Sequence, residues 1–258
     1  VGTLHIRPVL NMKSDVDIKN MKSISQEAFE MVKNYKGSHS GEHGDGIVRS
    51  EFHEMMFGKK IINAFEEIKD TFDNKNLLNP GKIVRPYKSN DRSLMRYKSG
   101  YQANNINTHY DWSNWGQFSD AVEMCNNNGA CRKLDSGVMC PSYRVTKEEK
   151  DLVRGRANTL RLALSNQLPE GSFASKDMYE TMELCVSCKA CQRECPMSVD
   201  MAKMKSEFLS HYYKKFSMPI KDRVISNMPR LIWLLKIIAP TFNKVKNFPL
   251  ISTIVNKF

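Results

Sequence analysis

The feature that most constrains the fold of this chain is a run of four closely spaced cysteines. Cys185, Cys188, Cys191 and Cys195 follow the pattern C-x2-C-x2-C-x3-C, and Pro196 comes directly after the last of them. Three thiolates at two-residue gaps can ligate three corners of one cubane iron–sulfur cluster, whereas the fourth is set back and points toward another cluster. The alternative, a zinc site, usually takes two CxxC pairs separated by a dozen or more residues. The spacing therefore predicts iron–sulfur ligation.

Three further cysteines lie upstream and form a degenerate copy of the same element. Cys125 and Cys131 are spaced C-x5-C, and Cys140 precedes Pro141 as Cys195 precedes Pro196. Two-cluster proteins of this type exchange their fourth cysteines. We therefore expect Cys140 to complete the cluster of Cys185, Cys188 and Cys191, and Cys125, Cys131 and Cys195 to hold a second cluster. Seven thiolates cannot fill eight positions, so the second cluster is expected to be three-iron or to have a non-cysteine fourth ligand. The alternative is that the upstream cysteines are buried and free.

Composition narrows the class of protein further. The chain has 258 residues, 41% of them hydrophobic, which suffices for one large domain or two modest ones. An odd number of cysteines and no secretory signal favour a reducing, cytoplasmic setting. The net charge of +11 leaves nucleic acid, anionic lipid or acidic small molecules as candidate partners. Basic residues beside the cysteines account for part of this charge, so we expect no nucleic-acid partner. The competing interpretation of the charge is a zinc-dependent protein that binds nucleic acid.

Patterning along the chain predicts several segments. Apolar residues at helical spacing predict helices near residues 25–35, 59–72 and 147–167, the first ended by Gly37. We expect a first domain over residues 1–86, a linker over 87–116, a cysteine-bearing domain over 117–215, and a basic apolar tail over 216–258 leading to a missing C-terminal domain. The apolar run of the tail is interrupted by Lys236 and stopped by Pro240, so it is too short to span a bilayer. It could lie on a membrane surface, or pack on protein outside these residues, the interpretation we favour.

The first domain carries a glycine-rich loop, Gly41-Glu42-His43-Gly44-Asp45-Gly46. Its glycines allow the backbone to approach a planar cofactor or to take positive φ angles. Glu42 supplies a hard metal ligand and His43 a general base. The competing interpretation is a turn with a solvated acid and a surface histidine. His39, His53, His109 and His211 match no motif and are expected to be surface or satisfied structural histidines.

Three segments together carry a family resemblance: residues 3–8 (TLHIRP), the loop 41–46 and residues 76–82 (NLLNPGK). They resemble the C-terminal end of the FAD-linked oxidase family, which includes D-lactate, glycolate and D-2-hydroxyglutarate dehydrogenases. The cysteine module, with residues 140–146 and 154–158, is similar to the ferredoxin-like part fused to large bacterial FAD and Fe–S D-2-hydroxyacid dehydrogenases. The resemblance covers roughly residues 1–215. It implies an α+β fold, in which part of an oxidase cap domain precedes an α-helical ferredoxin-like iron–sulfur domain, and it marks the chain as a fragment.

The resemblance also implies roles for individual residues. FAD would be bound mostly by a missing upstream domain, with Glu42, His43, Gly44, Asp45 and Gly46 contributing from this chain. His5 and Glu42 would ligate a divalent metal, zinc or manganese, together with a histidine lying before the first residue. His43 would lie near flavin N5 and take the substrate hydroxyl proton. Arg7 stands where many relatives have Asn, and its guanidinium could clamp a substrate carboxylate.

The function implied is oxidation of a D-2-hydroxyacid of the 2-hydroxyglutarate or lactate type to the 2-oxoacid. The substrate would be a small 2-hydroxycarboxylate, and electrons would pass through two iron–sulfur clusters to a quinone or an electron carrier. We expect a cytoplasmic location, with peripheral contact to the inner face of the membrane as an option, and no turnover by this chain alone. The alternative is a stand-alone iron–sulfur electron-transfer subunit, but such a carrier has no use for the metal ligand and proton acceptor in the loop 41–46.

Overall fold

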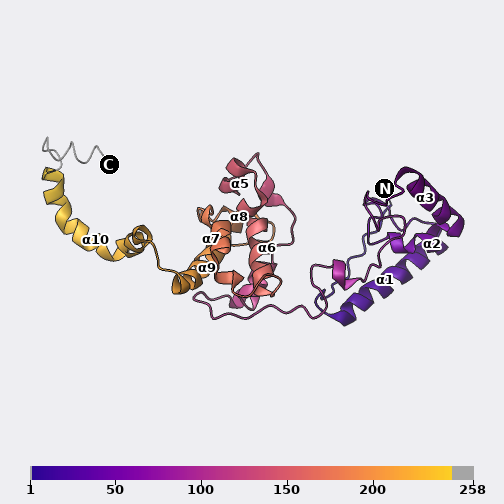
Figure 1. Ribbon diagram of the computed structural model, residues 1–258, viewed down its shortest axis with the longest axis horizontal. Helices are drawn as coiled ribbons and strands as arrows, with labels where there is room; N and C mark the ends of the chain where they lie inside the picture. The colour runs from indigo at the N-terminus through magenta and orange to yellow at the C-terminus, as the bar shows by residue number, and fades with distance from the viewer. Residues whose placement is uncertain (1, 246–258) are drawn as a thin grey trace. The chain divides into compact units, whose positions relative to one another are not determined.

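The computed structural model describes residues 2–245 and divides into two compact units, residues 1–102 and 103–258 (Figure 1). The boundary falls inside the segment expected to be a linker, residues 87–116. Val1 and the last part of the predicted tail, residues 246–258, lie outside the described residues. The α-helices are α1 (Asp15–Asn34), α2 (His53–Phe57), α3 (Lys59–Phe72), α4 (Phe118–Glu123), α5 (Pro141–Thr146), α6 (Val153–Leu164), α7 (Lys176–Glu183), α8 (Ala190–Glu194), α9 (Met201–Lys215) and α10 (Ile220–Val245).

Helix α1 is longer than the sequence pattern predicts. It begins after Ser14, whose hydroxyl accepts a hydrogen bond from the Asp17 N–H, and two acidic residues in its first turn complement the helix dipole. The predicted helix over residues 25–35 is therefore the C-terminal half of α1. The end is as predicted: the N–H of Gly37 donates to the Val32 carbonyl just beyond the last turn.

Helix α3 matches the predicted residues 59–72, but its apolar stripe does not face a core. No residue of α3 is buried, and Phe72 is 85% exposed. An amphipathic helix normally covers its apolar face. The described part of the chain leaves this face open.

The sequence resemblance implies an α+β fold, and the described residues contain its helices but no strand. Among residues 2–245 the structure contains no β-strand. Residues 2–11 run without helix or turn, as an extended segment would, and Leu4 and Val9 are almost fully exposed. A strand requires a partner to satisfy its backbone N–H and C=O groups, and the described residues supply none.

The second unit is built around a core that the cysteines share with large apolar side chains. Helix α6 packs against α4, α7 and α9, and Phe118, Leu160, Met182 and Phe208 are almost completely buried between them. Helix α6 begins at Val153 rather than near residue 147, because Lys147 takes a positive φ of 61° and ends α5. The helix start lies so close to the preceding turn that a Cβ on Gly155 would lie 2.0 Å from the Glu149 carbonyl oxygen.

A buried carboxylate fastens the entry of this unit to α9. Glu207 accepts hydrogen bonds from the backbone N–H groups of His109 and Tyr110 and from the Trp112 indole. Burial alone would raise the pKa of Glu207, but these donors outweigh it and hold the pKa below its usual value. The ionised carboxylate is therefore the form that stabilises this connection.

Helix α10 exposes many apolar side chains. Ile220, Ile225 and Ile232 are each at least 66% exposed, and Trp233 is 60% exposed. Among the described residues, no helix has the length and apolar character needed to cross a membrane.

Candidate metal and iron–sulfur sites

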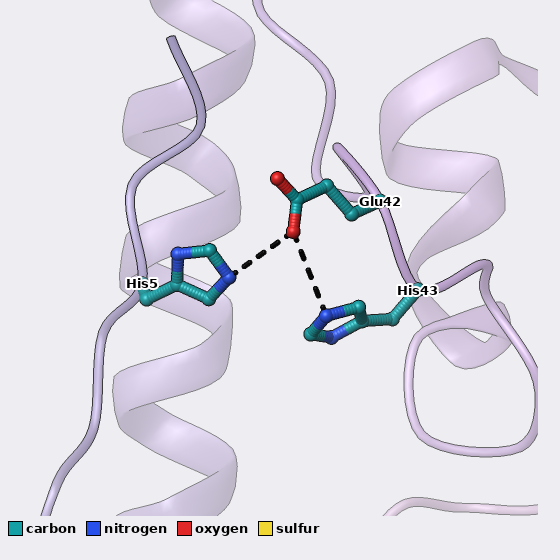
Figure 2. A group of neighbouring side chains, drawn as sticks. All are labelled: His5, Glu42 and His43. Carbon is teal, nitrogen blue, oxygen red and sulfur yellow. Dashed lines mark ion pairs between the residues drawn. The ribbon is translucent and has the colours of Figure 1, made fainter. Parts of the chain in front are cut away.

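The first unit brings His5 and Glu42 together, as the sequence interpretation requires of metal ligands. Figure 2 shows both imidazoles pointing at one carboxylate oxygen of Glu42. The His5 Nε2 atom lies 3.3 Å and the His43 Nε2 atom 3.6 Å from Glu42 Oε2. All three residues are exposed. The ligand atoms lie close enough together to hold a metal ion, and the group is accessible to a ligand from solvent.

Gly41 lies close to the Thr3 side chain of the segment that carries His5. A Cβ at position 41 would lie 2.7 Å from the Thr3 Oγ1 atom, so a larger residue there would require the Thr3 side chain to move. Gly44 and Gly46 take positive φ angles of 70° and 53°, as the sequence interpretation allows. Arg7 is exposed on the same N-terminal segment.

The loop also forms a second cluster, which sequence reasoning missed. His39 and His53 were expected to be surface or satisfied histidines, but the structure buries both beside Asp45. The Nε2 atoms of His39 and His53 lie 3.7 Å from Asp45 Oδ1 and 3.1 Å from Asp45 Oδ2, respectively. Burial lowers the pKa of His39 and so favours its neutral imidazole, although Asp45 opposes the effect. The Asp45 carboxylate, expected to serve the cofactor, therefore faces two histidines.

In the second unit, one cavity collects the four cysteines predicted to share a cluster. Cys140, Cys185, Cys188 and Cys191 all line it, with the apolar side chains of Met139 and Val153 beside them. Ser187 and Lys189 take positive φ angles of 52° and 60°, which curl the chain between successive cysteines. Cys195 follows α8 and does not line this cavity.

Backbone structure explains how Cys140 reaches this cavity from 45 residues away. It caps the N-terminus of α5, with Pro141 in the first turn. The preceding residues are held by Glu194, whose carboxylate accepts the N–H groups of Val138 and Met139 and pairs with Lys133. These contacts lower the pKa of Glu194 to about 2. The cysteine run thus anchors the upstream segment through the residue before Cys195.

Arg156 lies beside this cavity, a contact that the sequence analysis did not predict. Its side chain is completely buried, and its Nη1 atom lies 3.8 Å from the Cys140 Sγ atom. The guanidinium also donates to the carbonyl oxygens of Asp151 and Thr181, and it lies 3.7 Å from the Asp151 carboxylate. A fixed positive charge therefore borders the four-cysteine cavity. The only sequence signal was an arginine within the segment 154–158.

The remaining three cysteines, Cys125, Cys131 and Cys195, do not line one common cavity among those described. Cys125 and Cys131 are buried in the same core and lie close enough to influence one another electrostatically. The Asn127 side-chain oxygen lies 3.8 Å from the Cys125 Sγ atom. Cys195 is half-buried. These three cysteines therefore do not line the four-cysteine cavity.

The donor set of the four-cysteine cavity fits an iron–sulfur cluster. Burial raises the pKa of the Cys191 thiol to about 11 and also raises that of Cys131. Such thiols stay protonated at neutral pH unless a metal displaces the proton. Four thiols converging on one apolar cavity, beside a buried guanidinium, can accept a cluster whose thiolate cage is negatively charged.

Comparison with known proteins supports both halves of this description. Residues 1–83 match the family described as FAD linked oxidases, C-terminal domain, and residues 121–199 match the 4Fe-4S dicluster domain. D-2-hydroxyglutarate dehydrogenase of Pseudomonas putida is 31% identical over 88% of this chain and 25% of its own length. The enzyme of the same name from Escherichia coli is 28% identical over 99% of this chain and 28% of its own length.

A shorter match covers the first unit alone. Glycolate oxidase subunit GlcD of Bacillus subtilis is 32% identical over 32% of this chain and 17% of its own length. The chain thus spans about a quarter of the length of the dehydrogenases it matches over most of its residues. No solved structure matches it.

Proposed function

The chain joins the C-terminal domain of FAD-linked oxidases to a 4Fe-4S dicluster domain, and from this premise we propose that it serves a D-2-hydroxyacid dehydrogenase. The enzyme would oxidise a small 2-hydroxycarboxylate, of the 2-hydroxyglutarate or lactate type, to the 2-oxoacid. Electrons would then leave one at a time through the iron–sulfur clusters. The curated relatives named D-2-hydroxyglutarate dehydrogenase favour 2-hydroxyglutarate among these substrates.

The observation that carries the proposal is the cavity shared by Cys140, Cys185, Cys188 and Cys191. It supports the ligand exchange expected from the sequence, in which the cysteine of one run completes the cluster of the other. We assign Cys125, Cys131 and Cys195 to the second cluster. With three thiolates available, that cluster is three-iron or takes a non-cysteine ligand.

The geometry at His5, Glu42 and His43 supports the substrate-oxidising half. Tetrahedral zinc with ligand bonds of about 2.0–2.1 Å places neighbouring ligand atoms about 3.3 Å apart. The distance from His5 Nε2 to Glu42 Oε2 is 3.3 Å. His5 and Glu42 therefore suit a zinc or manganese ion, to which a further ligand outside this chain would be added.

His43 is suited to proton transfer rather than to packing. Its side chain is 65% exposed and stands beside the metal-ligand pair. FAD, when bound, supplies the acceptor for the substrate hydride. We assign to His43 the abstraction of the substrate hydroxyl proton and to Arg7 the binding of a substrate carboxylate. Gly44, Asp45 and Gly46 would contact the cofactor through backbone atoms, because the Asp45 carboxylate faces His39 and His53.

The proposal also covers the β component of the fold and the electron acceptor. We assign the β component of the α+β fold to residues 3–11, which would pair with strands of the holoenzyme outside this chain.

The electron acceptor would be a quinone or a carrier protein. The exposed apolar side chains of α10 are a candidate face for contact with the surface of a membrane, which sedimentation with anionic vesicles would test.

Two variants of the holoenzyme that contains this chain would test the proposed function. His43→Ala should slow reduction of the flavin by D-2-hydroxyglutarate at least about 100-fold, because general base catalysis contributes at least this much. Cys188→Ser should leave flavin reduction in a single turnover intact and stop the onward reduction of a one-electron dye. D-lactate measured beside D-2-hydroxyglutarate would assign the substrate. Dye reduction by Cys188→Ser at the wild-type rate, or fast flavin reduction by His43→Ala, would contradict the proposal.

A further inference from the structure

The first unit contains a cluster of potential metal ligands that the proposed oxidation does not use. His39 comes from the loop before α2, Asp45 from the same loop, and His53 from the first residue of α2. The side chains of His39 and His53 are 0% and 3% exposed, and that of Asp45 is 24% exposed. The outward-facing group of His5, Glu42 and His43 is a separate one, built from other side chains of the loop and from the N-terminal segment.

Hydrogen bonds do not explain why these polar groups are buried. Among the described residues, none of the four imidazole nitrogens of His39 and His53 makes a hydrogen bond of good geometry, nor does Asp45 Oδ1, although the Arg49 backbone interacts with His39. The His53 Nε2 atom is 3.1 Å from Asp45 Oδ2 yet does not make a hydrogen bond of acceptable geometry. Buried polar groups are paired in the great majority of proteins. An ion bound at the centre of the three side chains is one accepted reason for such an exception.

The distances suit a metal ion. The two imidazoles approach different oxygens of one carboxylate, at 3.7 Å and 3.1 Å. These values bracket the separation of about 3.3 Å between neighbouring ligands of tetrahedral zinc. A bidentate Asp45 and the two Nε2 atoms would supply four donor atoms from three residues. Two imidazoles with one carboxylate are ligands of intermediate softness, which excludes the oxygen-preferring Ca²⁺ and Mg²⁺.

Aromatic rings close the cluster and orient its ligands. The Phe57 ring lies 5.7 Å from the His39 ring and 5.4 Å from the His53 ring, and Phe29 meets His39 edge-on at 5.3 Å. Apolar walls of this kind limit the access of water to the cluster. If both Asp45 oxygens bind, the three residues fill all four positions of a tetrahedral ion, and a filled coordination shell is typical of structural rather than catalytic zinc.

We propose that His39, Asp45 and His53 bind a structural Zn²⁺ that fastens the loop carrying Glu42 and His43 to the start of α2. Asp45 follows Glu42 by three residues, so a metal that fixes Asp45 limits the movement of the outward-facing pair. This Zn²⁺ takes no part in the chemistry and positions the residues that do. The proposal does not depend on the substrate assigned above, because it concerns metal content and loop mobility.

Zinc content of the full chain tests the site directly. The background variant is Glu42→Gln, which disables the outward-facing group and leaves the buried one intact. We expect Glu42→Gln protein, dialysed against a weak chelator, to retain one zinc per chain. Adding His53→Gln should remove that zinc. Adding His53→Cys instead should restore it, because a thiolate is also a zinc ligand. Iron in the same samples counts folded second units and serves as an internal standard.

Each outcome decides for or against the site. If Glu42→Gln protein holds no zinc after dialysis, or if the added His53→Gln substitution leaves its zinc content unchanged, the proposal is overturned. Loss of zinc in both His53 variants would also overturn it, since it would indicate a packing role for the imidazole. Amide hydrogen exchange gives a second readout in the Glu42→Gln protein itself. Removal of zinc with a strong chelator should speed exchange over residues 39–46, and unchanged exchange would refute the fastening role.

Discussion

Replacing Arg156 should lower the reduction potential of the cluster that we assign to Cys140, Cys185, Cys188 and Cys191. The guanidinium is completely buried, with its Nη1 atom 3.8 Å from the Cys140 Sγ atom. An electron added to the cluster is stabilised by this positive charge, so the variant Arg156→Met makes reduction harder. Arg156→Lys keeps the charge and is the matched control, although lysine cannot reproduce the forked hydrogen bonds to Asp151 and Thr181.

The size of the shift follows from the distance. With an effective dielectric constant of about 20, two unit charges 3.8 Å apart interact by about 4.4 kcal/mol. For a one-electron reduction, this energy corresponds to a shift in reduction potential of about 190 mV. The added electron is shared over the whole cluster, and doubling the mean distance halves the value to about 95 mV. We therefore expect Arg156→Met to lower the potential by about 95–190 mV.

An anaerobic redox titration followed by EPR measures this potential, with iron content as the control for an intact cluster. Asp151 offers an opposite test, because its carboxylate lies 3.7 Å from Arg156 and carries negative charge toward the same region. Asp151→Asn should raise the potential. A shift of less than about 30 mV in Arg156→Met, with the cluster retained, would refute the assignment of Arg156 as a charge that tunes this cluster.

Three further predictions concern the second unit. Cys140→Ser and Cys188→Ser should abolish the same EPR signal, whereas Cys195→Ser should spare it and abolish the other; loss of the Cys188 signal in Cys195→Ser would contradict the ligand exchange. Glu207→Gln should destabilise the unit by about 1.5–3 kcal/mol in denaturant unfolding, because a charged hydrogen-bond acceptor is lost. Folding lowers the pKa of Glu207, so the carboxylate stabilises the unit above a pH of about 4.3, and this stabilisation is lost as the pH falls through the folded pKa. A difference in stability between Glu207→Gln and wild type that persists in strong acid would contradict this explanation. Glu194→Gln should release iron to a chelator faster, because the Val138 and Met139 N–H groups that hold the segment before Cys140 lose their carboxylate; unchanged release would show that this contact does not support the cluster.

Local patterns predicted some elements with their bounds and missed the starts of others. The apolar spacing over residues 59–72 predicted α3 with its observed bounds. The exchange rule of two-cluster proteins assigns Cys140 to the group of Cys185, Cys188 and Cys191, and these four cysteines line one cavity; that they hold a cluster stays a prediction. The start of α1 was missed since its first half buries only Ile18, so apolar periodicity is weak there. The Ser14 cap with Asp15 and Asp17 was the signal that could have found it.

The buried histidines were missed for a different physical reason. His39 and His53 are separated by fourteen positions and meet only because the loop folds back on the start of α2. No spacing rule describes such a tertiary meeting. The position of Arg156 was not predicted for the same reason, because its burial beside Cys140 depends on tertiary packing rather than on its neighbours in sequence. The α+β prediction relied on resemblance, and the described residues supply only its helices.

The attachment of residues 109–112 to α9 has a practical consequence for dissecting this protein. The first residues of the second unit are tied down at Glu207, and slightly earlier by the N–H of Asn104 donating to the Leu164 carbonyl. A protease that cuts before residue 103 would therefore leave intact both of these contacts within the cysteine-bearing unit. The excised piece should keep its colour and its iron. Such a piece could be transplanted as a portable electron relay onto another flavoprotein.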